Sequence, residues 1–143
     1  MLVIDDQPSV RISLEYLLGL SGYDVCGADS GLNAIALAET EAIDGALVDG
    51  HMPVMNGFET CLRLRAQASA RGRTLRIWFM TGASTAAIER RAIELGAFGV
   101  LTKPFDYTTL LARLEHGFSS PLPSVPSSAG ARYGNDAGKN LPP

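Results

Sequence analysis

The sequence predicts an α/β fold in which helices cover both faces of a five-stranded parallel sheet, a three-layer (βα)5 sandwich. The first observation is a unit that occurs five times: a short apolar run, a polar turn and an amphipathic helical pattern. The second is that three of the apolar runs are nearly continuous, as in strands that are buried on both faces. Alternating strands and helices with right-handed connections form an open parallel sheet, and about 118 residues are too few for an eight-stranded barrel.

The first strand is predicted at residues 2–4, and the helix after it has apolar side chains at three- and four-residue spacing. These apolar side chains are Val10, Leu14, Leu17 and Leu18. Pro8 suits the first position of this helix, and Gly22 suits the position just after its end. The second strand is predicted at 23–26, and Ser30 can cap the helix that follows it.

The third strand is predicted at residues 46–48, and the fourth at 75–80. The helix between them carries four side chains on one face, which are Phe58, Cys61, Leu62 and Arg65. Ser84 can cap the next helix, and Gly96 can end it, since glycine readily adopts the left-handed conformation found after helices.

The fifth strand is predicted at residues 98–101, and Asp106 can cap the last helix. A flavodoxin-like strand order, 2-1-3-4-5, fits this pattern. We therefore expect a domain at residues 1–118. Residues 119–143 contain five Pro, five Ser and three Gly with few apolar residues, which is typical of a tail or linker.

Composition narrows the class of protein. The formal net charge of −3 gives no reason to expect direct binding of nucleic acid, which requires clustered Lys and Arg. No apolar stretch reaches the roughly 18 residues that span a bilayer, so we expect no membrane association and a cytoplasmic location. Cys26 and Cys61 lack metal-ligand spacing and lie in apolar segments, so we expect small core side chains.

Polar residues stand at the ends of four predicted strands: Asp5 and Asp6, Asp49, Thr81, and Lys103. In an open α/β sheet, ligands bind at the carboxyl ends of the strands. Three carboxylates there repel each other, by on the order of 4 kcal/mol per pair at about 4 Å. One lysine cannot balance three negative charges, whereas a divalent cation can, and oxygen ligands favour Mg²⁺.

Four stretches together resemble the receiver domain of two-component response regulators: VIDDQPSVR, LVDGHMPVMNG, FMTGAS and GAFGVLTKPF. The resemblance covers residues 1 to about 118. It implies that Asp49 accepts a phosphoryl group from a phosphohistidine and that Asp5 and Asp6 bind Mg²⁺ (or Mn²⁺). It also implies that Lys103 contacts the phosphoryl oxygens and that Thr81 donates a hydrogen bond to one of them.

Three further implications concern residues near this site. By the same resemblance, the backbone carbonyl of His51 is a metal ligand, and the bond between Lys103 and Pro104 is cis. The His51 side chain stands where the family tunes the lifetime of the acyl phosphate, and we expect it to face solvent or the rim of the site. Val100 departs from the family, which often has Tyr or Phe there as a rotating switch.

The resemblance implies several partners. They are a sensor histidine kinase or phosphotransfer protein, a downstream effector protein or domain, and a second copy bound through helix 4, strand 5 and helix 5. It also implies that the domain is no enzyme beyond catalysing its own phosphorylation and dephosphorylation.

Other interpretations remain open from the residues. Asp5 and Asp6 can simply cap the first helix, and Asp49 can cap a turn before Pro53. An aspartate-nucleophile phosphatase needs Asp-x-Asp after the first strand, whereas these acids are adjacent. A flavin carrier needs a loop rich in Ser, Thr and Gly where this chain has DDQPS. A degenerate receiver used only for binding would lack site residues.

Overall fold

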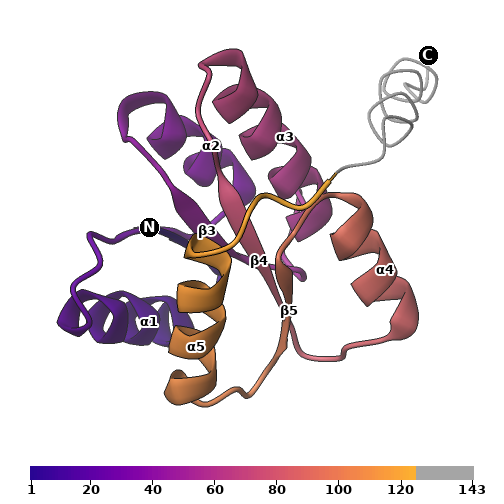
Figure 1. The fold of residues 1–143 in the computed structure, drawn as a ribbon. Coiled ribbons are helices and arrows are strands. Elements are labelled where there is room, and N and C mark those ends of the chain that lie inside the picture. The colour runs from indigo at the N-terminus through magenta and orange to yellow at the C-terminus, as the bar shows by residue number, and fades with distance from the viewer. Residues whose placement is uncertain (125–143) are drawn as a thin grey trace.

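The computed structural model describes residues 1–124, in which strands and helices alternate along the chain (Figure 1). The strands are β1 (Leu2–Ile4), β2 (Cys26–Ala28), β3 (Gly45–Asp49), β4 (Arg76–Thr81) and β5 (Gly99–Thr102). The helices are α1 (Pro8–Leu20), α2 (Gly31–Thr40), α3 (Gly57–Ala70), α4 (Ala86–Glu94) and α5 (Tyr107–Phe118). All strand pairs are parallel, and the sheet order is β2-β1-β3-β4-β5. The predicted class and strand order are confirmed.

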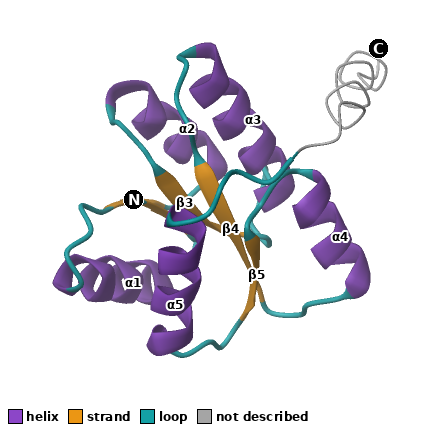
Figure 2. Ribbon diagram, viewed as in Figure 1, coloured by secondary structure: helices purple, strands orange, loops and turns teal. Residues whose placement is uncertain are grey.

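The sheet is buried on both faces, because successive side chains of a strand point to opposite sides. In β4, Ile77 and Phe79 join the core cluster beneath α2, α3 and α4, whereas Trp78 and Met80 join the cluster beneath α1 and α5. None of these four side chains is more than 1% exposed. Figure 2 shows the two helical layers with the sheet between them. This burial makes the sheet a rigid base for the loops at its carboxyl edge.

Most predicted helix ends are confirmed. Pro8 is the first residue of α1, and Gly22 follows its end with φ +89°. Gly96 follows α4 with φ +78°. Ser30 and Asp106 cap α2 and α5, each accepting a hydrogen bond from the backbone N–H three residues on, at 3.1 and 2.7 Å.

Two predicted boundaries are wrong. The second strand was expected at 23–26, but pairing with β1 begins only at the last residue of that range. Tyr23 and Val25 are apolar because they pack against the cluster beneath α1 and α5. The cap of α4 is Thr85, whereas the hydroxyl of Ser84 donates to Glu89 at 2.6 Å. Adjacent hydroxyl residues compete for one cap position, and the pattern alone did not separate them.

Both cysteines carry free thiols. Cys61 is buried in the cluster beneath α2, α3 and α4, and Cys26 is partly buried against the same cluster. Burial raises the pKa of both thiols, which favours the protonated, unreactive form. Their expected role as small core side chains is consistent with these positions.

The tail predicted at 119–143 lies mostly outside the described residues, so its boundary remains a prediction. Among residues 1–124, no helix combines the length and apolar character needed to cross a membrane.

Candidate functional site

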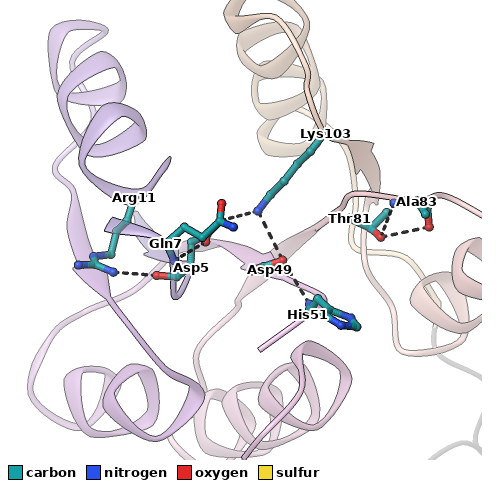
Figure 3. Close-up of polar contacts among 8 residues, drawn as sticks. All are labelled: Asp5, Gln7, Arg11, Asp49, His51, Thr81, Ala83 and Lys103. Atoms are coloured by element: carbon teal, nitrogen blue, oxygen red, sulfur yellow. Dashed lines mark hydrogen bonds and ion pairs between the residues drawn. The ribbon is translucent and has the colours of Figure 1, made fainter. Parts of the chain in front are cut away.

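Three acidic side chains meet where β1 and β3 end. Figure 3 shows two of them, Asp5 and Asp49. Asp5 and Asp6 follow β1 directly, and Asp49 is the last residue of β3. One carboxylate oxygen of each lies within 4.8 Å of those of the other two. These strands are neighbours in the sheet, so residues more than forty positions apart in the sequence share one pocket.

The two adjacent acids differ in exposure. Asp5 is fully buried, and its Oδ1 accepts a hydrogen bond from the backbone N–H of Gln7 at 2.9 Å. Asp6 is exposed to solvent. The N-cap position of α1 is occupied by Gln7. The alternative in which Asp5 and Asp6 serve only as helix caps is therefore not supported by their positions.

Lys103, the residue after β5, supplies positive charge to the pocket. Its Nζ lies 2.6 Å from Oδ2 of Asp5 and 3.5 Å from Oδ1 of Asp49. Its backbone N–H donates to the carbonyl of Thr81 at 2.7 Å, which ties the ends of β4 and β5 together. The bond between Lys103 and Pro104 is cis, as the resemblance implied. One ammonium group thus bridges two of the three carboxylates.

The Asp49 carboxylate sits in an unfavourable electrostatic position. It is 5% exposed, and this burial raises the pKa of its carboxyl group above the ordinary value. The neighbouring Asp5 and Asp6 also raise this pKa, whereas Lys103 and the His51 N–H, which donates to Oδ1 at 3.2 Å, lower it. The net shift in this pKa is upward, and burial is its largest cause.

The donor set fits a hard divalent cation. All three side chains offer carboxylate oxygens, which Mg²⁺ prefers over nitrogen and sulfur. Mg²⁺ usually retains several water ligands, and the exposed side of the pocket at Asp6 is open to water. A cation there would offset the repulsion among the three carboxylates.

Thr81 and His51 lie at the edges of this pocket. Thr81 is 8% exposed, and its hydroxyl donates to the carbonyl of Ala83 at 3.2 Å and accepts from the N–H of Ala83 at 3.3 Å. Figure 3 shows this hydroxyl turned toward Ala83. The imidazole of His51 is exposed, as expected. The structure therefore brings Lys103 into direct contact with Asp5 and Asp49. The Thr81 hydroxyl forms its two hydrogen bonds within its own loop.

Two residues between the end of β3 and the first residue of α3 were not singled out from the sequence. At Gly57, the first residue of α3, a Cβ atom would lie 2.4 Å from the carbonyl oxygen of Asp49. Glycine is therefore required for α3 to begin against the site backbone, and the Asn-Gly pair was an available signal. Val54 is 97% exposed with φ +69°, a conformation that costs an L-residue on the order of 1 kcal/mol.

Comparison with known proteins places this architecture in a family. Residues 1–115 match the model of the response regulator receiver domain. The chain belongs to the response regulator receiver domain family. Receiver domains are the phosphoacceptor signalling modules of two-component systems, and they bind Mg²⁺ at an acidic pocket. The family differs from the aspartate-nucleophile phosphatases and flavin carriers, against which the residues after the first strand already argued.

Individual relatives agree with the receiver assignment. The alkaline phosphatase synthesis transcriptional regulatory protein PhoP of Bacillus subtilis is 34% identical over 128 residues, covering 90% of this chain and 52% of the relative. Response regulator MprA of Mycobacterium avium is 33% identical over 114 residues, covering 80% and 48%. The structure of chemotaxis protein CheY4 of Vibrio cholerae, 33% identical, superposes with a TM-score of 0.75 over 81% of this chain and 95% of that one. This chain thus spans about half the length of the curated relatives it matches.

Proposed function

We propose that this receiver domain accepts a phosphoryl group on Asp49, in a Mg²⁺-dependent transfer from the phosphohistidine of a sensor histidine kinase or phosphotransfer protein. The observation that supports the proposal is the convergence of three carboxylates within 4.8 Å, beside the Lys103 ammonium group, at the carboxyl edge of the sheet. The domain acts as a signalling switch that catalyses only its own phosphorylation and dephosphorylation.

The cation site comprises Asp5, Asp6, Asp49 and the backbone carbonyl of His51. These oxygen donors suit Mg²⁺, and Mn²⁺ accepts the same ligands. When bound, the cation supplies positive charge that neutralises the carboxylates and the incoming phosphoryl oxygens. The residues of the chain hold the reacting groups in position.

The transfer itself requires little of the protein beyond position and charge. A carboxylate oxygen of Asp49 forms a bond to phosphorus, while the bond between phosphorus and the donor imidazole nitrogen breaks. The electron pair of that bond leaves with the imidazole. Lys103, whose Nζ is 3.5 Å from Oδ1 of Asp49, is placed to contact the phosphoryl oxygens, where charge is spread in the transition state.

Phosphorylation then changes the hydrogen bonds at Thr81. The acyl phosphate carries a charge near −2 and three strong acceptor oxygens. We propose that the Thr81 hydroxyl leaves the carbonyl of Ala83 and donates to one of them, a charge-assisted bond that contributes about 1.5–3 kcal/mol. That is enough to shift an equilibrium between two states a few kcal/mol apart. Since Val100 is aliphatic, rotation of an aromatic side chain at that position is not part of this switch.

The switched surface is proposed to comprise α4, β5 and α5. Its charged side chains include Arg90, Arg91, Arg113 and Glu115. It would meet a downstream effector protein or domain, or the same surface of a second copy. One relative is a transcriptional regulatory protein, which says nothing of DNA contact by this domain, and the net charge of −3 still favours none.

Intact-mass measurement after incubation with acetyl phosphate tests the proposal. With Mg²⁺ present, wild-type protein should gain the mass of one phosphoryl group, and EDTA should prevent the gain. The variant Asp49→Asn should gain nothing. Asp29→Asn serves as a matched control, because Asp29 directly follows β2 at the same edge of the sheet but is exposed and lies outside the acid cluster.

The outcomes separate this function from a binding module of the same fold. A folded wild-type protein that gains no mass, with Mg²⁺ and either acetyl phosphate or a phosphorylated kinase domain, would point to a degenerate receiver. Mass gain that survives Asp49→Asn would place the acceptor elsewhere.

We further propose that the exposed imidazole of His51 alters hydrolysis of the phosphorylated form. His51 follows Asp49 by two residues, and its backbone N–H already contacts the Asp49 carboxylate. The comparison is the dephosphorylation rate of wild type with that of His51→Ala, after excess phosphodonor is removed. Equal rates would dismiss a role for the imidazole.

A further inference from the structure

Asp5 is held at every polar atom. Its backbone N–H donates to the carbonyl of Ala28 at the end of β2, at 3.1 Å. Its two carboxylate oxygens are held by Gln7 and Lys103, at 2.9 and 2.6 Å. Its backbone carbonyl accepts a hydrogen bond from Nη1 of Arg11 at 2.8 Å, as Figure 3 shows. Of these partners, Arg11 is the one that bonds to the peptide group between the two acids.

That peptide group sets the direction in which the backbone enters Asp6. The atoms from Cα of Asp5 to Cα of Asp6 lie close to one plane, because the peptide bond has partial double-bond character. A hydrogen bond that fixes the carbonyl oxygen therefore fixes the orientation of the backbone entering Asp6. Asp6 is exposed, so its direction depends on this backbone more than on packing.

The position of Arg11 depends in turn on a glycine in β2. A Cβ atom at Gly27 would lie 1.8 Å from Oε1 of Glu15 and 3.2 Å from Cδ of Arg11. The missing side chain leaves room for this pair of residues beside β2. Within the pair, Nε of Arg11 lies 3.8 Å from Oε1 of Glu15, and the Arg11 side chain is only 18% exposed. The guanidinium group is thus confined beneath the turn that carries the acids.

We propose that Arg11 is a positioning residue for the cation site, holding the turn of Asp5 and Asp6 in its ligand geometry through the carbonyl of Asp5. The proposal rests on the proposed function, since it concerns the same Mg²⁺. Residues that orient metal ligands through hydrogen bonds typically matter for metal binding. When such a residue is removed, the affinity for the metal falls by about 10–100-fold.

The direction in which Mg²⁺ affinity changes when Arg11 is removed distinguishes a positioning role from a purely electrostatic one. Arg11 carries a positive charge, which by itself opposes binding of a cation nearby. If Arg11 acted only through its charge, removing it would tighten Mg²⁺ binding. If it positions the acids, removing it weakens binding despite the lost repulsion.

Isothermal titration with Mg²⁺ tests this on wild type, Arg11→Met, Arg11→Lys and Arg63→Met. The matched control Arg63 also pairs with a glutamate one helical turn away, Glu59 at 2.8 Å, but lies on the exposed side of α3. Arg11→Met should weaken binding about tenfold. Arg11→Lys, which keeps a donor, should recover part of the loss, and Arg63→Met should match wild type.

A second measurement reports on the turn of Asp5 and Asp6 when no cation is present. In EDTA, hydrogen exchange of the Gln7 amide, which is bonded to Asp5, should be faster in Arg11→Met than in wild type. If that variant does not fold, Gly27→Val replaces it, since a side chain there takes the place of the Glu15 carboxylate and crowds Cδ of Arg11. It should also weaken Mg²⁺ binding.

Unchanged or tighter Mg²⁺ binding in the folded Arg11→Met variant, or in Gly27→Val in its place, overturns the positioning role and leaves the proposed function intact. A wild-type protein that binds no Mg²⁺ removes both proposals. These two failures are distinguished within one set of titrations.

Discussion

The two halves of the site are built to different degrees. At the ends of β1 and β3, the Asp5 and Asp49 carboxylates already contact the Lys103 ammonium group. At the end of β4, the Thr81 hydroxyl instead bonds to Ala83, within its own loop. We call these the acid half and the hydroxyl half.

The difference shows which part of the chemistry is prepared in advance. The acid half is assembled by strand ends that the sheet holds in place. Its carboxylates repel one another, and a bound cation would reduce that repulsion. The hydroxyl half has satisfied its hydrogen bonds locally, so it gains a new partner only when a strong acceptor appears. Under the proposed function, one half binds the reactants and the other responds to the product, which is the arrangement that a switch requires.

Removing Lys103 should have the largest effect on stability, and this effect arises in the acid half. Lys103→Met leaves Asp5 and Asp49 buried without their shared ammonium group. Breaking such a pair costs about 3 kcal/mol, toward the low end of buried pairs because the Lys103 side chain is 21% exposed. Urea denaturation in EDTA measures this loss, and Mg²⁺ should restore more stability to this variant than to wild type.

A surface pair provides the control for Lys103. Arg63→Met breaks the pair with Glu59, whose side chains are 54% and 45% exposed, and should cost no more than about 0.5 kcal/mol. Equal losses for the two variants would mean that the acid half is no more dependent on its lysine than an ordinary surface pair.

Removing the charge of Asp49 should increase the stability of the metal-free protein, whereas removing Lys103 should decrease it. The folded-state pKa of Asp49 is raised, so the metal-free protein loses stability as pH rises from the unfolded pKa, about 3.9, through the folded value. Asp49→Asn avoids this loss and keeps an acceptor for the His51 N–H. In EDTA at pH 7 it should be more stable than wild type, and the gain should vanish toward pH 3.

Denaturation at the two pH values distinguishes burial of charge from a general effect of the substitution. Asp44→Asn alters an exposed carboxylate before β3 and should leave stability unchanged at both. A gain in Asp49→Asn that persists unchanged at low pH would show that ionisation of Asp49 is not its cause.

The acid half was the more predictable part from sequence. Parallel strands place their carboxyl ends at one edge, so acids directly after the first and third strands must lie close together once the strand order is known. The hydrophobic runs predicted the strands, and the order was taken by analogy with flavodoxin-like folds. The convergence of the acids therefore depended on the strand order, and the three-residue error in the start of β2 does not change that order.

The hydroxyl half was less predictable, because its geometry depends on local competition. Thr81 was correctly placed at a strand end, yet no pattern showed that its hydroxyl bonds to Ala83. Ser84 and Thr85 were equally suited to cap α4, and loop geometry decided between them. The link from Gly27 through Arg11 to Asp5 was likewise invisible, since it joins three segments by side-chain contacts.

The smallest effect is expected for Thr81→Ala. Its loss removes two hydrogen bonds to Ala83, but Ala83 is exposed, so water replaces them and the cost in stability should stay below about 1 kcal/mol. Because these bonds lie within the hydroxyl half, the Mg²⁺ dissociation constant should remain within about twofold of wild type, as measured by titration calorimetry. Thr81→Ser, which keeps the hydroxyl, should match wild type in both measurements. A large loss of Mg²⁺ affinity in Thr81→Ala alone would mean that the hydroxyl already supports the acids before phosphorylation, and the division of the site into two independent halves would be wrong.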